Sequence, residues 1–386
     1  MKRVKLFIFT ILLVSSSAFA QDNFTLNGYV KYMQTNFLVS TPSTTLLTDN
    51  LIHNRLNAKW YASDKLQFSV ELRNRAFYGE YTKSIPNYGD LLDNDPGFVD
   101  MAFTWVNEPS FILHTMIDRA NFTYQSKKWN LRVGRQRINW GINTVWTPND
   151  VFNALNYLDF DYEERPGSDA VKFQYYLGDF SNLEVAFSPA DSIEGSIAAI
   201  KYGTNYKGYD YQIMGGYYKQ DLVLGAGWAG NIKSAGFKGE ASYFTHQNAV
   251  FDSFGNLSAT ASIDYTFKKG WYGGVSFLYT SGGTTKSLAG NSALQLLGNN
   301  LSAKQLMPTR YTFFLMASKS LTAASSLNLS GMYAPGTNFF LLFPAITYSI
   351  NNQFDLDFVA QASFIEMAQK LQHGGSGVFA RLKWSF

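Results

Sequence analysis

Three arginines fall within six positions of the stretch Asn130–Gly141, NLRVGRQRINWG. A guanidinium is permanently charged and binds carboxylates or phosphates through paired hydrogen bonds, so Arg132, Arg135 and Arg137 could form an anion-binding surface. Strict alternation along a strand would put Arg132 on one face and the other two on the opposite face. We expect a β-bulge at Gly134 to bring all three to one face and to send Gln136, Ile138 and Trp140 to the other.

Other chemically capable residues lack the spacing of a catalytic or metal site. The four histidines, His53, His114, His246 and His373, contain no i, i+4 pair, and the sequence has no phosphate-binding glycine motif. Asp93 and Asp95 in DNDPG are typical of a polar turn, with a calcium site as the alternative. The chain has no cysteine, which excludes disulfides, thiolate ligands and a lipidated cysteine. We therefore predict neither an enzyme nor a cofactor.

The first twenty residues have the pattern of a secretory signal peptide. Three basic residues precede a short apolar run, and Ala18-Phe19-Ala20 supplies the cleavage pattern before Gln21. The apolar run is too short for the alternative, an uncleaved membrane anchor. Cleavage removes three of the 32 basic residues and none of the 29 acidic residues, so the basic surplus disappears. A nucleic-acid partner is not expected, and 21–386 is predicted to be one domain.

The exported chain is rich in aromatic residues but has no long apolar run. Aromatics make up 17% of the full sequence, led by 32 Phe and 24 Tyr, while the mean hydropathy is slightly below zero. A transmembrane helix is therefore not expected, and the composition favours an all-β fold, an antiparallel transmembrane β-barrel of the outer membrane. A soluble two-sheet sandwich is the alternative.

Apolar and polar residues alternate with period two along nearly the whole chain, as in LSATASIDYTF at 257–267. We expect about eighteen strands, or sixteen if two of them merge. Their ranges are 24–37, 51–63, 65–78, 113–126, 128–140, 168–178, 180–189, 195–206, 208–219, 221–232, 233–246, 254–268, 270–281, 307–321, 323–335, 338–350, 352–366 and 374–386.

The lengths of the connections provide an independent check. The links after even-numbered strands are short, whereas the long ones follow odd-numbered strands, near 38–50, 79–112, 141–167, 247–253, 282–306 and 367–373. Outer-membrane barrels have short periplasmic turns and longer extracellular loops. Both termini are therefore expected in the periplasm, with 79–112, 141–167 and 282–306 as extracellular loops.

The chain ends on GVFARLKWSF, an alternating segment that closes with Trp384 and Phe386. It resembles the C-terminal signal strand of Gram-negative outer-membrane barrels. The resemblance implies recognition by the barrel-assembly machinery and a location in the outer membrane, in contact with its lipid.

The segments GRQRINWG, WTPNDVFN and ERPGSDA, between Arg132 and Lys172, resemble a stretch of porin-like outer-membrane barrels of Gram-negative bacteria. The resemblance implies membership of a porin-like family. It supplies neither a substrate nor catalytic residues.

If the apolar faces contact lipid, the polar faces line a lumen whose charges can be assigned by strand. One wall is predicted to be basic, and two acids, Glu240 and Asp264, are predicted to lie across from it. An inward-folded loop, 141–167 or 79–112, is expected to narrow the lumen; the first contains Asp159, Asp161, Glu163, Glu164 and Arg165. The predicted pore-lining bases are Lys31, Arg55, Lys59, Arg73, Arg75, Arg119, Arg132, Arg135, Arg137, Arg381 and Lys383.

These features predict a passive channel for small polar or anionic solutes, in which the basic wall and an inward loop set selectivity. The alternative is a barrel plugged by its own loops that serves as an accessory subunit of an outer-membrane complex. Homo-oligomerisation and a complex partner both stay open at this stage.

Overall fold

The computed structural model describes residues 23–39, 45–154, 167–248, 255–287, 301–367 and 369–386. The expected signal peptide lies outside these residues. The described residues form one antiparallel sheet of nineteen strands. The strands are β1 (Phe24–Val39), β2 (Thr45–Ser63), β3 (Leu66–Gly79), β4 (Ala102–Glu108), β5 (Phe111–Gln125), β6 (Trp129–Gln136), β7 (Ser168–Tyr176), β8 (Asn182–Ser188), β9 (Ile197–Tyr206), β10 (Tyr209–Tyr218), β11 (Asp221–Ile232), β12 (Ala235–His246), β13 (Asn256–Thr266), β14 (Trp271–Thr280), β15 (Tyr311–Ser320), β16 (Ser325–Ala334), β17 (Phe339–Ser349), β18 (Phe354–Met367) and β19 (Lys370–Ser385).

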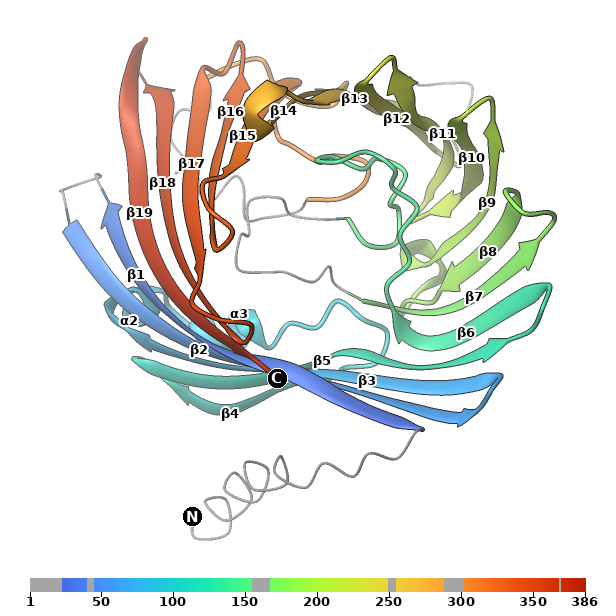
Figure 1. Ribbon diagram of the computed structural model, residues 1–386, viewed down its shortest axis with the longest axis horizontal. Coiled ribbons are helices and arrows are strands. Elements are labelled where there is room, and N and C mark those ends of the chain that lie inside the picture. Colours follow the sequence, from blue (N-terminus) through green and yellow to red (C-terminus); the bar gives the residue numbers. More distant parts are fainter. Residues whose placement is uncertain (1–22, 40–44, 155–166, 249–254, 288–300, 368) are drawn as a thin grey trace, which may run out of the picture.

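The sheet closes on itself, because β1 pairs with β19 on one side and with β2 on the other. Strand β3 pairs directly with β5, so eighteen strands complete the ring and β4 is additional (Figure 1). The predicted eighteen-strand antiparallel barrel is confirmed, and each of the eighteen predicted segments overlaps one strand of the ring. The sixteen-strand alternative is wrong.

The alternation of polar and apolar side chains gives each strand a polar inner face and an apolar outer face. On β13, Ser258, Thr260 and Ser262 are buried toward the interior, whereas Ile263 is 52% exposed. In such a strand the backbone N–H and C=O groups form hydrogen bonds with the neighbouring strands, while only apolar side chains are exposed to lipid. The outer face of the ring therefore suits a bilayer.

The two ends of the barrel differ in their connections. At the end that we call the turn end, β5 and β6 are joined by residues 126–128, and β9 and β10 by 207–208. The opposite end, the loop end, has the connections after β3, β6 and β14. The long link predicted at 367–373 is wrong, because β18 runs to Met367, β19 begins at Lys370, and these two residues pair. Strands that extend past the apolar band lose the lipid-imposed alternation, which explains why sequence patterning ended them too early.

The connection from β3 to β5 contains two one-turn helices, α2 (Glu80–Ser84) and α3 (Tyr88–Leu92), followed by β4. Strand β4 pairs with the loop-end half of β5, and β6 pairs with its turn-end half. Strand β4 therefore continues the wall where β6 stops. The prediction of a strand over 128–140 is wrong beyond Gln136, and the strand β4 inside 79–112 was not predicted.

Two short 3-10 turns complete the regular structure, η2 (Ile193–Gly195) and η3 (Lys268–Gly270). No helix in the described part of the chain combines the length and the hydropathy needed to cross a membrane.

Candidate functional site in the barrel interior

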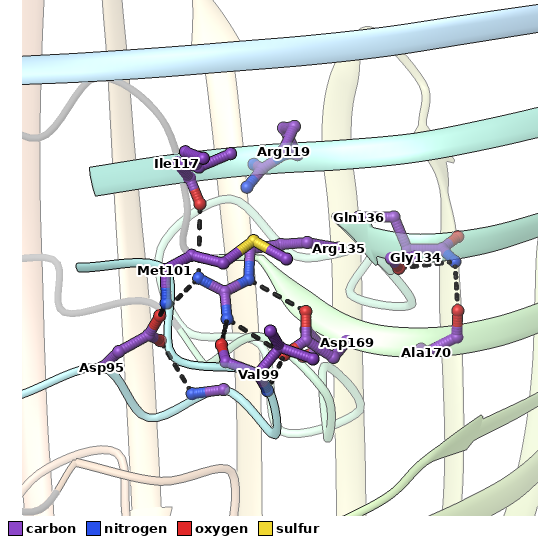
Figure 2. A network of polar contacts seen from close by, with 12 residues as sticks. Asp95, Val99, Met101, Ile117, Arg119, Gly134, Arg135, Gln136, Asp169 and Ala170 are labelled. Carbon is purple, nitrogen blue, oxygen red and sulfur yellow. Dashed lines mark hydrogen bonds and ion pairs between the residues drawn. The ribbon is translucent and has the colours of Figure 1, made fainter. Parts of the chain in front are cut away.

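Arg135 is the centre of a polar cluster at the junction where β4 replaces β6 (Figure 2). Its guanidinium forms a two-pronged ion pair with Asp169 of β7, Nε to Oδ1 at 2.9 Å and Nη2 to Oδ2 at 2.9 Å. Nη1 binds Asp95 at 2.6 Å, and the carbonyls of Val99 and Ile117 accept further hydrogen bonds. One buried side chain thus joins β5, β6, β7 and the segment that leads into β4.

The carboxylates of this cluster also hold backbone amides. Asp95 accepts hydrogen bonds from the N–H groups of Gly97 and Met101, and Asp169 accepts one from Val99. Asp95 therefore serves as a structural anchor, and Asp93 accepts a hydrogen bond from the Thr104 hydroxyl. No group of three or more metal-ligating residues occurs among the described residues, and these contacts fit the polar-turn interpretation of DNDPG.

Gly134 breaks the alternation without an inserted residue, so the bulge predicted there is wrong. The pairing of β6 with β5 and β7 stays one-to-one through this position, but Gly134 has a φ of 110°, and a Cβ there would approach the Ala120 carbonyl oxygen to 2.3 Å. The next two residues are both buried. Gln136, predicted to face outward, instead donates hydrogen bonds to the Arg132, Gly134 and Ala170 carbonyls.

After Gln136 the chain leaves the wall and enters the barrel as residues 137–154, which we call the lumen segment (Figure 1). Ile138 and Trp140, predicted to face lipid, are 0% and 1% exposed. Trp140 packs edge-on against Phe152 at 5.1 Å between ring centroids, and its indole N–H binds Glu184 of β8 at 3.1 Å. Trp140 is therefore part of an interior apolar cluster rather than an outer aromatic girdle.

Glu240 of β12 anchors the lumen segment from the opposite wall. Its Oε1 accepts the backbone N–H groups of Ile142, at 2.5 Å, and Asn143, and its Oε2 accepts that of Asn149 at 3.1 Å. The carboxylate is 1% exposed. Three convergent N–H donors satisfy a buried carboxylate, as the cost of burying a charge requires. The other predicted acid, Asp264, is opposite Gly236, close to the turn end of β13, and takes no part in this contact.

Two asparagines extend the attachment along neighbouring strands. The Asn143 amide donates to Thr260 at 2.8 Å and accepts from Ser262, both on β13. The Asn149 amide donates to the Ala226 carbonyl of β11 at 3.0 Å and accepts from Ser242 of β12 at 2.7 Å. The segment is therefore held by inward-facing side chains of β12 and β13 and by a backbone carbonyl of β11.

An apolar contact continues this attachment toward β15. Trp146 packs edge-on against Phe314 at 6.2 Å between centroids, inside a buried cluster that includes Met307, Met332 and Leu341. The lumen segment consequently contacts inner faces of strands between β8 and β15, and the basic wall lies on the other side of the interior.

Part of that basic wall is neutralised by an acid that the sequence analysis missed. Asp118 binds Arg55 through Oδ2 at 2.6 Å and Arg73 through Oδ1 at 3.0 Å, while Glu71 binds Arg55 at 2.5 Å. The pairing of β3 with β5 shifts register at this point, so Asp118 and Arg119 both face inward. Strict alternation turns Asp118 outward, which is why it was overlooked; a β-bulge carries no clear sequence signal here.

The last and first strands of the ring supply three more of the predicted bases. Lys31 is fully buried, with its ammonium 5.4 Å from the centre of the Tyr29 ring, and Lys383 approaches the same ring at 4.7 Å. Arg381 pairs with Asp357 at 2.9 Å. These bases face the barrel interior from β1 and β19. That they line a pore stays a prediction.

The remaining predicted bases lie on β2, β3, β5 and β6, except for Arg137, which follows β6. The Arg119 guanidinium donates to the Asp118 carbonyl at 2.7 Å, and Arg132 donates to the Thr123 hydroxyl at 3.0 Å. Arg75 contacts His114 at 3.4 Å, Lys59 is half-buried opposite Ser69, and Arg137 is half-buried at the start of the lumen segment.

A second charge cluster, on β7, β8 and β9, was also missed. Glu184 pairs with Lys201 at 2.8 Å and Lys172 at 3.4 Å. All three residues occupy inward positions of alternating strands, so the pattern that revealed the basic wall could have revealed them too. The predicted loop residues Asp159, Asp161, Glu163, Glu164 and Arg165 lie outside the described residues.

The short helix α2 is attached to the loop end of β2. Thr82 donates to Asp49 through its N–H at 3.1 Å and its hydroxyl at 2.9 Å. Glu80 accepts hydrogen bonds from the Thr48 N–H and hydroxyl, which hold the pKa of the Glu80 carboxyl below its usual value. The connection after β3 is therefore held at both its start and, through Asp95, its end.

No family model and no curated protein matches the sequence. Several solved barrels match the structure over nearly their whole length. OccK5 (OpdH) of Pseudomonas aeruginosa has a TM-score of 0.58 at 6% identity, over 95% of this chain and 99% of that one. OccAB4 of Acinetobacter baumannii has a TM-score of 0.56 at 10% identity, over 96% and 100%. Pseudomonas aeruginosa OprD has a TM-score of 0.56 at 8% identity, over 95% of each chain.

The closed ring and its apolar outer face define a transmembrane β-barrel of the outer-membrane class. Within that class, the eighteen-strand ring of this chain shares its fold with the Occ and OprD barrels, so the predicted resemblance to porin-like proteins is confirmed at the level of the fold.

Proposed function

We propose that the protein is a passive outer-membrane channel for small polar solutes, with a preference for anions. The observation that carries this proposal is the division of the interior. The lumen segment is fixed by Glu240 to one side, and arginine and lysine side chains line the other. A passage between a fixed segment and a cationic wall selects solutes by size and by charge.

The bases on the cationic wall have two distinct roles. Arg55, Arg73 and Arg381 are paired with carboxylates and mainly hold the wall together. Arg132, whose guanidinium binds a neutral hydroxyl, has no carboxylate partner among the described residues. We assign anion preference to residues of the second kind, because a charge compensated at 3 Å contributes little field a few ångströms away.

The passive mechanism requires no catalytic group and no cofactor. Solutes diffuse through the lumen, replace part of their hydration shell with hydrogen bonds from guanidinium groups, and leave because each contact is weak. The barrel-assembly machinery remains our proposed partner during biogenesis, on the pattern of Trp384 and Phe386, and the periplasmic location of both termini remains part of the proposal.

The alternative, a plugged accessory barrel, also has support, since the lumen segment occupies part of the interior and contacts the inner wall at strands between β8 and β15. Planar-bilayer recording separates the two functions. Folded, purified protein should insert with uniform conductance steps if it is a channel. Folding is checked independently by heat-dependent migration on gels, and folded protein without conductance would overturn the channel and favour the plugged barrel.

A further inference from the structure

A row of polar side chains crosses the outer face of β2, β3 and β5, where apolar residues are expected. Asn54, Asn74 and Thr115 lie directly opposite one another in the pairing register. The Thr115 hydroxyl donates to the Asn74 amide oxygen at 2.7 Å, and the Asn74 amide nitrogen donates to the Asn54 oxygen at 3.0 Å. Trp105 of β4 donates to Thr115 at 2.9 Å, and Asn54 donates to the Tyr29 carbonyl at 3.1 Å.

Alternation places this row on the outside. Asn54 is two residues from Ile52, which is 43% exposed, and Asn74 is four from Val70, which is 46% exposed. Their immediate neighbours Arg55 and Arg73 are buried on the inner face. The half-buried Asn54 and Asn74 therefore face whatever surrounds the barrel, whereas Thr115, at 8% exposure, is buried and receives the Trp105 hydrogen bond.

The depth of the row follows from the aromatic residues on the same strand. On the outer face of β3, Phe68 and Tyr78 are ten residues apart, which at about 3.3 Å per residue and a tilt near 40° corresponds to a height of about 25 Å. This equals the apolar band of an outer-membrane barrel, whose edges carry aromatic girdles. Asn74 is six residues from Phe68, so the row lies well inside the band.

Lipid tails cannot satisfy amide groups at this depth. The hydrogen bonds along the row satisfy the amide oxygens, but the amide nitrogens of Asn54 and Asn74 each donate one hydrogen bond within the described part of the chain and keep a second N–H. Polar side chains inside a membrane commonly join one protein segment to another. The row therefore indicates a protein contact at this face.

We propose that the outer face around Asn54, Asn74 and Thr115 is the contact surface with a second copy of this chain. The row is uncharged and contains both donors and acceptors, so a copy related by a twofold axis presents matching groups to it. A strongly charged partner would find no counter-charge among the residues of the row. The contact requires a membrane-embedded barrel but not an open lumen, so it can hold whether or not the barrel conducts.

The absence of cysteine makes the contact directly measurable, because one introduced thiol takes one spin label. Ala76→Cys labels the outer face of β3 beside Asn74 without removing any residue of the row. Leu224→Cys, at a site that is 69% exposed on β11 across the barrel, is the matched control. Double electron–electron resonance in lipid nanodiscs measures the distance between two spin labels. It should give a short distance between the labels of two chains for Ala76→Cys and none for Leu224→Cys. Single barrels throughout, or equally short distances at both sites, would overturn the proposal.

A second variant tests the chemistry of the row. Asn54→Leu with Asn74→Leu replaces both amides by side chains that lipid accepts, so the barrel should still fold and show heat-dependent gel migration. The dimer dissociation constant should rise about tenfold or more, the effect of losing a few hydrogen bonds inside a membrane. Leu72→Ala, on the same face of β3 between Phe68 and Tyr78, is the control and should change the dimer dissociation constant less. Folded double-leucine barrels that still pair as tightly as the unmodified chain would contradict the role of the row.

Discussion

The Arg135 guanidinium meets the Asp169 carboxylate in a side-by-side pair, with both N–O distances at 2.9 Å, at the point where β6 leaves the wall and β4 continues it. Each charge is buried, and the arginine also binds Asp95 and two carbonyls. The strands of a barrel wall have to stay paired around the whole ring. Where β6 ends and β4 begins, the Arg135 side chain links the two sides of the junction.

Removing this arginine should destabilise the barrel markedly. Arg135→Gln leaves Asp95 and Asp169 buried without their counter-charge, and breaking a buried pair in this way costs about 3–5 kcal/mol. Arg132→Gln is the matched control on the same strand and should cost less than about 1.5 kcal/mol, because Arg132 donates a single hydrogen bond, to the neutral Thr123 hydroxyl, among the described residues. Urea unfolding in vesicles measures both. Equal losses for the two variants would contradict the anchoring role of Arg135.

Glu240→Ala should loosen the lumen segment. Three backbone N–H groups lose their acceptor, and each buried donor left unsatisfied costs about 1–3 kcal/mol. The expected result is a larger or noisier single-channel current and faster proteolysis within residues 137–154. Asp264→Ala, on the adjacent strand and outside this contact, should leave both unchanged. An unaltered current and cleavage rate in Glu240→Ala would show that the carboxylate does not hold the segment.

Asp118→Asn should strengthen the positive potential of the wall, because Arg55 and Arg73 lose the carboxylate that they share. The anion-to-cation permeability ratio should rise, and the free energy of unfolding should fall by about 1–3 kcal/mol. Asp355→Asn, at a carboxylate that binds the Ser349 hydroxyl, serves as the control for the loss of one negative charge. If the permeability ratio rises equally in both variants, anion preference depends on the total charge of the lumen and not on the pairing of Asp118 with the arginines.

Trp140→Ala tests whether this tryptophan packs inside the barrel. Truncation of a buried tryptophan costs about 3–5 kcal/mol, and the indole also donates to Glu184. Trp105→Ala removes a tryptophan that is 66% exposed on the outer face and should cost clearly less. If Trp105→Ala destabilises the barrel as much as Trp140→Ala, Trp140 does not lie where the structure places it.

The strands were predictable because lipid outside and water inside impose a period of two on every crossing. The same rule failed where neither solvent dictates the face. Strand β6 ends at Gln136 because the left-handed Gly134 and the junction with β4 redirect the chain, and neither has a pattern in a single sequence. Strand β4 was missed because its seven residues lie inside a long polar connection.

The interior was predictable by residue type but not by pairing. Inward positions of Arg55, Arg73 and Glu240 follow from alternation, yet their partners depend on contacts between distant residues. Glu240 binds Ile142, 98 positions away, and Asp118 faces inward only because of a register shift. Such contacts depend on three-dimensional packing, which periodicity does not encode.

The central claim, a channel whose cationic wall favours anions, is tested most directly by the reversal potential of single channels under a potassium chloride gradient. The account predicts uniform conductance steps and a reversal potential of the sign that corresponds to chloride preference, reduced toward zero in Arg132→Gln. Folded protein that gives no conductance, or a reversal potential of the sign for potassium preference, would contradict it.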